Sequence, residues 1–417
     1  MIRNLLPLGA LLMGSAFLLF AGGLNGLILP IRGEIEGFTA ASLGLLGTGW
    51  ALGYVMGCLF TPWLVKRVGH IRAFGAMCAI AAITVLASLL FLTPWVWIPL
   101  RGLCGFCFAG AAMVVESWLN DKADNKSRGR IFGIYTMVNL GATTAGQLVI
   151  TLGDPSGYLF FVLAAMIYCT ALLPTAMSAT TTPTALVSVK LDLKRLWRNS
   201  PIAVFSVLMV GVSNAAFGSL SAVYAARIGL TLSDVALFAS VPVLAGALAQ
   251  VPVGALSDRL DRRVVLVGVA LLGLCADLIF IFAGLEGVTL TLAVAAVFGA
   301  SVYAMYPLIV AHANDHAAPG TSLQVSGGLL LVFGVGSIVG PTIAGFAMTG
   351  LGTSALFWVT GSAHVLLILF ALLRIRTRAP VPQEDKTAFK AAPSTRAMTP
   401  ETAVLAGEDE VPAATKE

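Results

Sequence analysis

Long runs of apolar residues recur along the chain and predict helices that cross a membrane. A transmembrane helix needs about 20 mostly apolar residues to span the hydrocarbon core. Prolines inside such runs are compatible with this interpretation, because neighbouring helices re-satisfy the freed backbone groups. The pattern therefore predicts an all-α, polytopic membrane protein. Its twelve expected spans are approximately 8–30, 43–65, 72–92, 95–117, 131–152, 157–178, 201–226, 234–256, 264–284, 288–311, 323–349 and 353–373.

Composition supports a membrane protein and excludes several classes. Apolar residues make up 58% and charged residues 11% of the 417 residues, whereas soluble domains have about 45–50% and about 25%. This excludes an ordinary cytoplasmic enzyme, a nucleic-acid-binding protein and a disordered chain. The six cysteines lie in apolar runs, so we interpret them as packing residues. The first run resembles a signal peptide but lacks a convincing cleavage site, so we interpret it as the first helix.

The distribution of Lys and Arg predicts the orientation of the helices. If the N-terminus is cytoplasmic, the loops and termini on that side hold 22 of the 25 Lys and Arg residues. The other side holds only Arg32 and Arg227, and Arg101 lies inside the fourth run. Because basic residues concentrate in cytoplasmic loops, we expect both termini to face the cytoplasm.

The chain divides into two halves of six spans, with a weak internal repeat. Lys66 and Asp258 follow the second and eighth spans and are 192 positions apart (258 − 66). Parallel six-helix repeats are a known transporter design, with the substrate near the midplane between them. The last stretch is rich in Ala, Pro, Thr and charge, which predicts disorder. We expect bundles at 1–178 and 201–374, a cytoplasmic loop at 179–200 and a disordered cytoplasmic tail at 375–417.

Two loops and one helix carry a family resemblance. The stretch from Gly254 to Arg263, GALSDRLDRR, resembles the signature loop of the major facilitator superfamily, although Asp261 replaces a glycine. A more degraded copy follows the second span, and the fourth span carries Arg101-x-x-x-Gly105. Further matches resemble the YcaD-like group of bacterial transporters: Val114-Val115-Glu116-Ser117, Arg128-Gly129-Arg130, Gly146-Gln147-Leu148, Tyr306-Pro307 and Gly336-Ser337-Ile338-Val339-Gly340-Pro341.

This resemblance implies the superfamily fold, a bacterial inner-membrane location and rocker-switch alternating access. It also implies that spans 1, 4, 7 and 10 face a central cavity, with contributions from spans 5 and 8. The polar residues that would then line a substrate site are Asn25, Arg101, Asn139, Gln147, Asn214, Gln250, Tyr303 and Tyr306. For each residue singly, hydrogen bonding between helices is an equal alternative.

The signature loops suggest a latch on the cytoplasmic side. In the second half, Asp258, beside Arg259, would pair with Arg130 or Arg262. In the first half, Glu116 would replace the missing acid and pair with Arg67 or Arg72. The alternative is that these are solvated loop charges, each pair contributing under about 1 kcal/mol.

Two ionisable residues lie deep inside predicted spans, where such groups are usually functional. Arg101 either extends its side chain to the outer surface or lies in the cavity, where it binds an anionic group or tunes a proton site. Asp277, in the ninth span, is a candidate for proton coupling, as is Glu116. The alternative for Asp277 is a protonated, hydrogen-bonded contact between helices.

No cofactor or metal is expected. Cys104-x-x-Cys107 lies in an apolar helix, which favours packing. His312-x-x-Asp315-His316 has helical spacing suitable for zinc but lies at an inner loop. The sequence lacks a Gly-x4-Gly-Lys-Ser/Thr loop, so ATP is not the direct driver.

These observations predict a secondary transporter of a small organic solute, either proton-coupled or a uniporter. Arg101 and the scarcity of interior acids favour anionic or zwitterionic solutes. The alternative is a proton-antiporting exporter of amphipathic compounds or drugs. A sensor or membrane-embedded enzyme is a distant alternative, because His364 stands alone and no catalytic groups converge. Expected partners are the solute and the bilayer, with no nucleic acid, and the protein is expected to act as a monomer.

Overall fold

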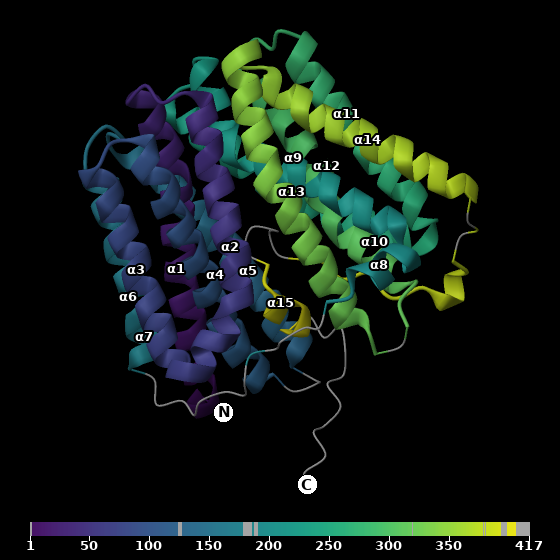
Figure 1. Cartoon of the computed structure of the whole chain (residues 1–417), viewed down its shortest axis with the longest axis horizontal. Helices are drawn as coiled ribbons and strands as arrows, with labels where there is room; N and C mark the ends of the chain where they lie inside the picture. The colour runs from purple at the N-terminus through teal and green to yellow at the C-terminus, as the bar shows by residue number, and fades with distance from the viewer. Residues whose placement is uncertain are drawn as a thin grey trace.

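The computed structural model describes residues 2–123, 127–177, 186, 191–318, 320–377, 379, 381–392 and 398–405, with only the backbone at 2–8 and 385. All regular secondary structure in these ranges is helical (Figure 1). The first half contains α1 (Ile2–Ile35), α2 (Ala40–Val68), α3 (His70–Leu90), α4 (Pro94–Lys122), α5 (Arg128–Leu148), η1 (Val149–Leu152), α6 (Leu159–Thr170) and α7 (Leu172–Ala176).

The second half repeats this order of long helices. It contains α9 (Pro201–Arg227), α10 (Leu232–Arg259), α11 (Arg262–Phe282), α12 (Val288–Asn314), α13 (Ser322–Leu351) and α14 (Ala355–Thr377). Short segments connect and follow the two halves: α8 (Leu193–Asn199), the turn η2 (Gln383–Asp385) and α15 (Pro400–Leu405).

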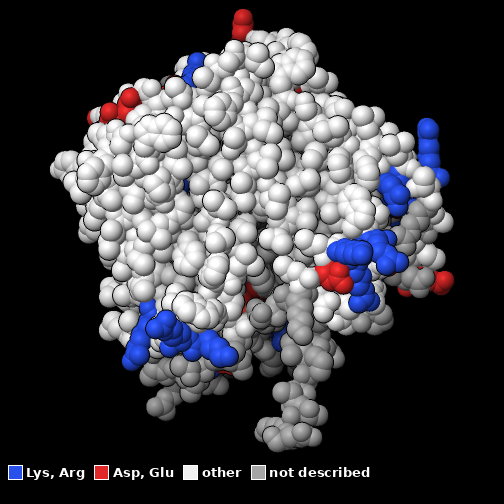
Figure 2. Space-filling view, viewed as in Figure 1, with Lys and Arg blue, Asp and Glu red and all other residues white. Residues whose placement is uncertain are grey.

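Eleven helical segments in the described ranges are long and apolar enough to cross a membrane, with α6 and α7 together forming one of them. The remaining predicted span, 131–152, corresponds to α5 and η1. This segment is less apolar because it carries Asn139, Gln147 and several threonines. The predicted class, an all-α polytopic membrane protein, is confirmed. Charged side chains are sparse over the middle of the surface in Figure 2.

Side-chain caps begin corresponding helices in the two halves. The Thr39 hydroxyl accepts a hydrogen bond from the Ser42 amide at the start of α2. The Thr231 hydroxyl accepts one from the Asp234 amide at the start of α10. Such caps satisfy amide groups that have no partner inside the helix. Thr39 and Thr231 are 192 positions apart (231 − 39), so the repeat seen in the signature loops extends to the helix starts.

The two halves pack side by side and meet along α2 and α13 (Figure 1). The two helices approach closely because glycine residues lie at their contact points. A side chain at Gly44 would collide with the Pro341 carbonyl, and one at Gly345 would meet the backbone of α2. Small residues let membrane helices approach closely enough for backbone packing.

The two ends of the bundle differ. We call the end that carries Arg67, Arg72, Arg130 and Arg259 the basic end, and the other the opposite end. At the opposite end the halves are joined, because Arg227 donates to both carboxylate oxygens of Glu34, at 2.8 and 3.0 Å. At the basic end α15 lies in the gap between the halves (Figure 1).

The tail differs from the expectation of disorder over 375–417. Helix α14 continues to Thr377, residues 381–392 run along the second half, and 398–405 are buried between the halves. Thr399, Thr402 and Glu401 form hydrogen bonds with polar side chains of the bundle. These bonds offset the cost of burying a polar segment. Residues 406–417 and half of the predicted 179–200 loop (179–185 and 187–190) lie outside the described residues.

Candidate functional site

A cavity lies between the halves and extends from the middle of the bundle toward the opposite end. The space open to the centres of water-sized molecules is about 120 Å³, enough for several waters or a small solute, since one water needs about 10–15 Å³. Three glycines of α1, at positions 22, 23 and 26, contribute to its wall. Its polar and aromatic lining consists of Trp50, Arg101, Phe108, Thr143, Gln147, Tyr168, Phe217, Ser219, Ser221 and Tyr303.

Arg101 supplies the charge of this cavity. Its guanidinium carbon lies 5.9 Å from the centroid of the Trp50 ring, a distance at which a cation is attracted to the ring face. Within the described part of the chain, no carboxylate forms a salt bridge with Arg101. The guanidinium therefore remains available to an anionic group, for which its planar donors are suited.

Three of the eight predicted cavity residues line this space: Arg101, Gln147 and Tyr303. Gln147 also accepts a hydrogen bond from Ser240, at 3.0 Å, and so joins α5 of the first half to α10 of the second. The sequence analysis missed Trp50 and Tyr168. Only the tertiary packing reveals them, because α2 and α6 are not among the helices that the resemblance assigned to the cavity.

The other five predicted residues lie outside the lining of this cavity. Asn25 donates to Cys104 Sγ at 3.5 Å, and Asn139 accepts from Ser15 at 3.4 Å, so both connect helices within the first half. Gln250 accepts from the Ala392 amide at 2.9 Å. Asn214 is buried elsewhere along α9, and Tyr306 faces a smaller pocket beside the tail.

Asp277 lies inside the second half, away from the cavity. Its carboxylate is 2.6 Å from His364 Nδ1 and accepts a hydrogen bond from Thr360 at 2.5 Å. His364 Nε2 in turn lies 3.1 Å from the Ser213 hydroxyl. These contacts join α9, α11 and α14. His364 therefore does not stand alone as the sequence suggested, and the 87 positions between it and Asp277 explain why the pair was missed.

Glu116 lies at the basic end of α4 and is fully buried. It does not pair with Arg67 or Arg72, which are exposed. Tyr135 donates to it at 2.7 Å and Thr402 at 2.9 Å, and Thr399 also donates. The predicted first-half latch is thus replaced in this state by hydroxyl groups, two of them from the tail.

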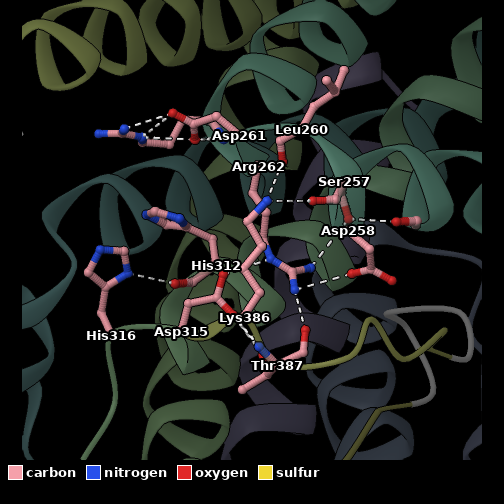
Figure 3. A network of polar contacts seen from close by, with 12 residues as sticks. Ser257, Asp258, Leu260, Asp261, Arg262, His312, Asp315, His316, Lys386 and Thr387 are labelled. Carbon is pink, nitrogen blue, oxygen red and sulfur yellow. Dashed lines mark hydrogen bonds and ion pairs between the residues drawn. The ribbon is translucent and has the colours of Figure 1, made fainter. Parts of the chain in front are cut away.

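The signature loop of the second half is tied to its own half (Figure 3). Asp258 lies 3.3 Å from Arg262, while Arg130 and Arg259 are exposed. Arg262 forms a second, buried ion pair with Asp315 at 2.7 Å. The Asp315 carboxylate therefore bonds to Arg262 and to Thr387. It is the carboxylate of the His312-x-x-Asp315-His316 pattern considered above for zinc.

Asp261, which replaces the usual glycine of the loop, begins α11. It accepts a hydrogen bond from the Arg263 amide at 3.0 Å and pairs with the Arg263 guanidinium at 2.7 Å. Burial raises the pKa of Asp261, but these hydrogen bonds and the charge of Arg263 outweigh it and hold the pKa below its usual range. A charged Asp261 therefore stabilises the loop at neutral pH.

Comparisons with known proteins agree with this architecture. The chain matches the family model of the Major Facilitator Superfamily over residues 11–247 and 203–407. The MFS-type transporter YcaD of Salmonella arizonae is 27% identical over 388 residues, covering 90% of this chain and 97% of the relative. YcaD of Escherichia fergusonii is 26% identical over 387 residues, covering 90% and 98%.

Solved structures share the fold at low identity. The nucleoside transporter NupG superposes with a TM-score of 0.72 at 14% identity, covering 91% of this chain and all of the other. A bacterial homologue of the human lysosomal transporter Spinster, in an inward-facing and occupied conformation, gives 0.69 at 18% identity, covering 92% and 98%. The family model matches both halves, and the predicted resemblance is confirmed: the chain belongs to the major facilitator superfamily of membrane transporters.

Proposed function

We propose that this chain is a secondary transporter that moves a small organic solute with an anionic group across the bacterial inner membrane. The observation that carries the proposal is the guanidinium of Arg101, which faces the central cavity without a carboxylate partner in the described residues. A charge inside a membrane protein is costly unless it has a partner or a function. A bound anion supplies that partner.

The arrangement of the halves supports alternating access with the basic end in the cytoplasm. The opposite end is held closed by Arg227 and Glu34 and by Thr48, whose hydroxyl lies 2.6 Å from that of Thr342. For the halves to rock, these polar contacts must separate together with the close packing of α2 against α13 around Gly44 and Gly345. The partly exposed ion pair itself contributes little to the closed state. The cavity then opens alternately to the two sides while the solute stays near Arg101.

We also propose that transport is coupled to protons, and that Glu116 rather than Asp277 is the residue that binds and releases the proton. Glu116 lies at the basic end of the gap between the halves and accepts a hydrogen bond from Thr402 of the tail segment that is buried there. Asp277 is enclosed by His364 and Thr360 within one half. A residue whose surroundings change as the halves rock can exchange its proton during the cycle, whereas an enclosed one keeps it.

Uptake into proteoliposomes tests the proposal. Labelled organic anions, neutral sugars and lipophilic cations would be offered to the wild type, to Arg101→Ala and to Arg101→Lys, with Arg376→Ala, exposed at the end of α14, as the control. We expect one class of anion to be transported, with at least a tenfold loss in Arg101→Ala and normal uptake in the control. Transport of neutral sugars alone, unaffected by Arg101→Ala, would contradict the proposal.

An exporter of amphipathic compounds is the second candidate, because a more apolar cavity opens at the basic end between α2 and α13. Its wall includes Val55, Leu59, Leu330 and Phe333, and its space for water-sized molecules is about 130 Å³. Apolar linings of this kind suit hydrophobic ligands. Transport of lipophilic cations but not anions in the same assay would support this candidate.

We also propose that the transporter acts as a monomer.

A further inference from the structure

The gap at the basic end contains a segment of the chain itself. Residues 398–405, which include α15, lie there against α4, α5 and α13 (Figure 1). Thr399, Glu401, Thr402 and Leu405 are each at most 2% exposed. A tail segment that contains a carboxylate is rarely buried so completely unless specific partners receive it.

Those partners come from the first half. Glu116 accepts hydrogen bonds from the Thr399 and Thr402 hydroxyls. The Asn120 amide donates to the Glu401 carbonyl at 3.2 Å and to its carboxylate at 3.0 Å. The Tyr54 hydroxyl donates to the Met398 carbonyl at 2.9 Å. Polar groups on α2 and α4 thus all bind the same tail segment, residues 398–405.

Glu116 would lose most of its donors without the tail. It forms no salt bridge in the described part of the chain, and its third donor is Tyr135 on α5. A buried carboxylate that lacks hydrogen-bond donors carries a large desolvation cost. When the tail leaves, the site therefore favours water or a solute that presents hydroxyl groups as Thr399 and Thr402 do.

The segment that precedes this one is bound to the other half (Figure 3). Thr387 donates from its amide and its hydroxyl to Asp315, at 2.9 and 2.8 Å. Lys386 donates to the Leu260 carbonyl at 2.6 Å, and the Phe389 ring lies directly against Gly254. The tail is thus attached to the second half by residues 386–392 and to the first by residues 398–405.

We propose that Glu116, Tyr135 and Asn120 form a binding site for solute hydroxyl groups at the basic end of the transport path, and that residues 398–405 occupy it as a built-in competitor. The solute is then a hydroxylated organic anion that meets the two residues at successive points of the path: its charged group is received by Arg101 in the cavity, and its hydroxyls by Glu116, which lies 15 positions (116 − 101) further along α4, about 22 Å away. This inference rests on the proposed function and narrows its substrate class. The halves close at the basic end only after the tail withdraws.

The test uses the purified full-length chain and removes the competing hydroxyls. In Thr399→Val/Thr402→Val, isosteric side chains no longer donate to Glu116. Thr377→Val is the matched control, because its hydroxyl bonds only to a carbonyl of its own helix. Two quantities are measured: the rate at which a maleimide modifies Cys58, which shares a pocket with Pro400, and the dissociation constants of D-gluconate and of hexanoate, which has no hydroxyls.

In the double variant we expect the maleimide to modify Cys58 several-fold faster. We also expect D-gluconate to bind several-fold more tightly, because the tail leaves the Glu116 site vacant in a larger fraction of the molecules. Hexanoate affinity and the Thr377→Val control should not change. Adding Glu116→Gln to the double variant should remove the gain in D-gluconate affinity. Unchanged Cys58 modification would overturn the competitor role.

Faster modification of Cys58 without tighter D-gluconate binding would overturn the hydroxyl site. These outcomes are distinguishable from failure of the proposed function. That failure would appear as an Arg101→Ala variant with unchanged anion transport, whatever the behaviour of Cys58.

Discussion

The two halves share one backbone plan but differ in the charged residues that their long helices carry inside the bundle. Helix α3 begins at position 70 and α11 at position 262, again 192 apart (262 − 70), and both are 21 residues long. In the first half, α4 carries Arg101 and Glu116, which face the space between the halves. The equivalent positions of α12, found by adding 192, are Ala293 and Leu308.

The second half instead pairs its buried charges internally. Asp277 is bonded to His364 and Arg262 to Asp315, while the positions equivalent to Asp277 and His364 in the first half are Val85 and Leu172. The two halves therefore share a scaffold but carry different charged groups on it. We interpret the first half as the one that receives the solute and the second as a rigid partner against which it rocks.

Breaking the internal pair of the second half should have the largest effect on stability. Asp277→Asn disturbs the contacts of both His364 and Thr360 in a fully buried site, and each buried polar group left without a partner costs about 1–3 kcal/mol. We expect a marked loss of thermal stability in detergent. Asp277→Asn with wild-type stability would show that the pair is not a structural element, and Glu286→Gln, at an exposed position, serves as the control.

Removing the cavity charge should affect binding more than stability. Arg101→Ala loses charged hydrogen bonds to a bound anion, worth about 1.5–3 kcal/mol, which corresponds to roughly 10–100-fold in affinity. Calorimetric titration with the transported anion measures the loss. Arg101→Lys should recover only part of it, because an ammonium lacks the planar fork of donors. Full recovery by lysine would remove the bidentate role.

Helix caps test the equivalence of the two scaffolds. Thr39→Ala and Thr231→Ala each remove the hydroxyl that accepts an amide hydrogen bond at a helix start, which typically costs about 1 kcal/mol. Because the caps are at matched positions, we expect similar decreases in thermal stability. A large decrease in one variant and none in the other would show that the halves differ in stability as well as in chemistry.

The ion pair that joins the halves should have the smallest energetic effect. Arg227 and Glu34 each have a side chain 25% exposed, and pairs of this kind contribute about 0.2–1 kcal/mol. Arg227→Ala should therefore leave thermal stability almost unchanged but favour opening at the opposite end. In a Leu43→Cys background, whose cysteine lines the cavity, modification by an impermeant maleimide from that side should become faster. A slower reaction would contradict this closure role.

The sequence was sufficient for the helical class, for eleven of the twelve predicted spans and for the repeat, because these depend on local apolarity. It offered a cavity position for Arg101 as one of two alternatives, and the structure places this residue in the cavity wall. It was insufficient for contacts between distant segments. The Asp277–His364 pair depends on the packing of α11 against α14, and the Glu116 site depends on a tail that composition marks as disordered. Asn25 and Asn139 were misassigned to the cavity lining because polarity alone does not show which side of a helix faces a neighbour.

The central claim is that Arg101 binds the solute while Asp277 stabilises the second half. The most direct test measures the thermal stability of Arg101→Ala and Asp277→Asn in parallel, with and without solute. A solute at 100 times its Kd stabilises the folded protein by about 2.7 kcal/mol. Arg101→Ala should unfold at the wild-type temperature without solute and gain nothing from the transported anion. Asp277→Asn should unfold at a lower temperature and keep the full gain. The reverse pattern, in which Asp277→Asn abolishes the gain and Arg101→Ala retains it, would contradict the account.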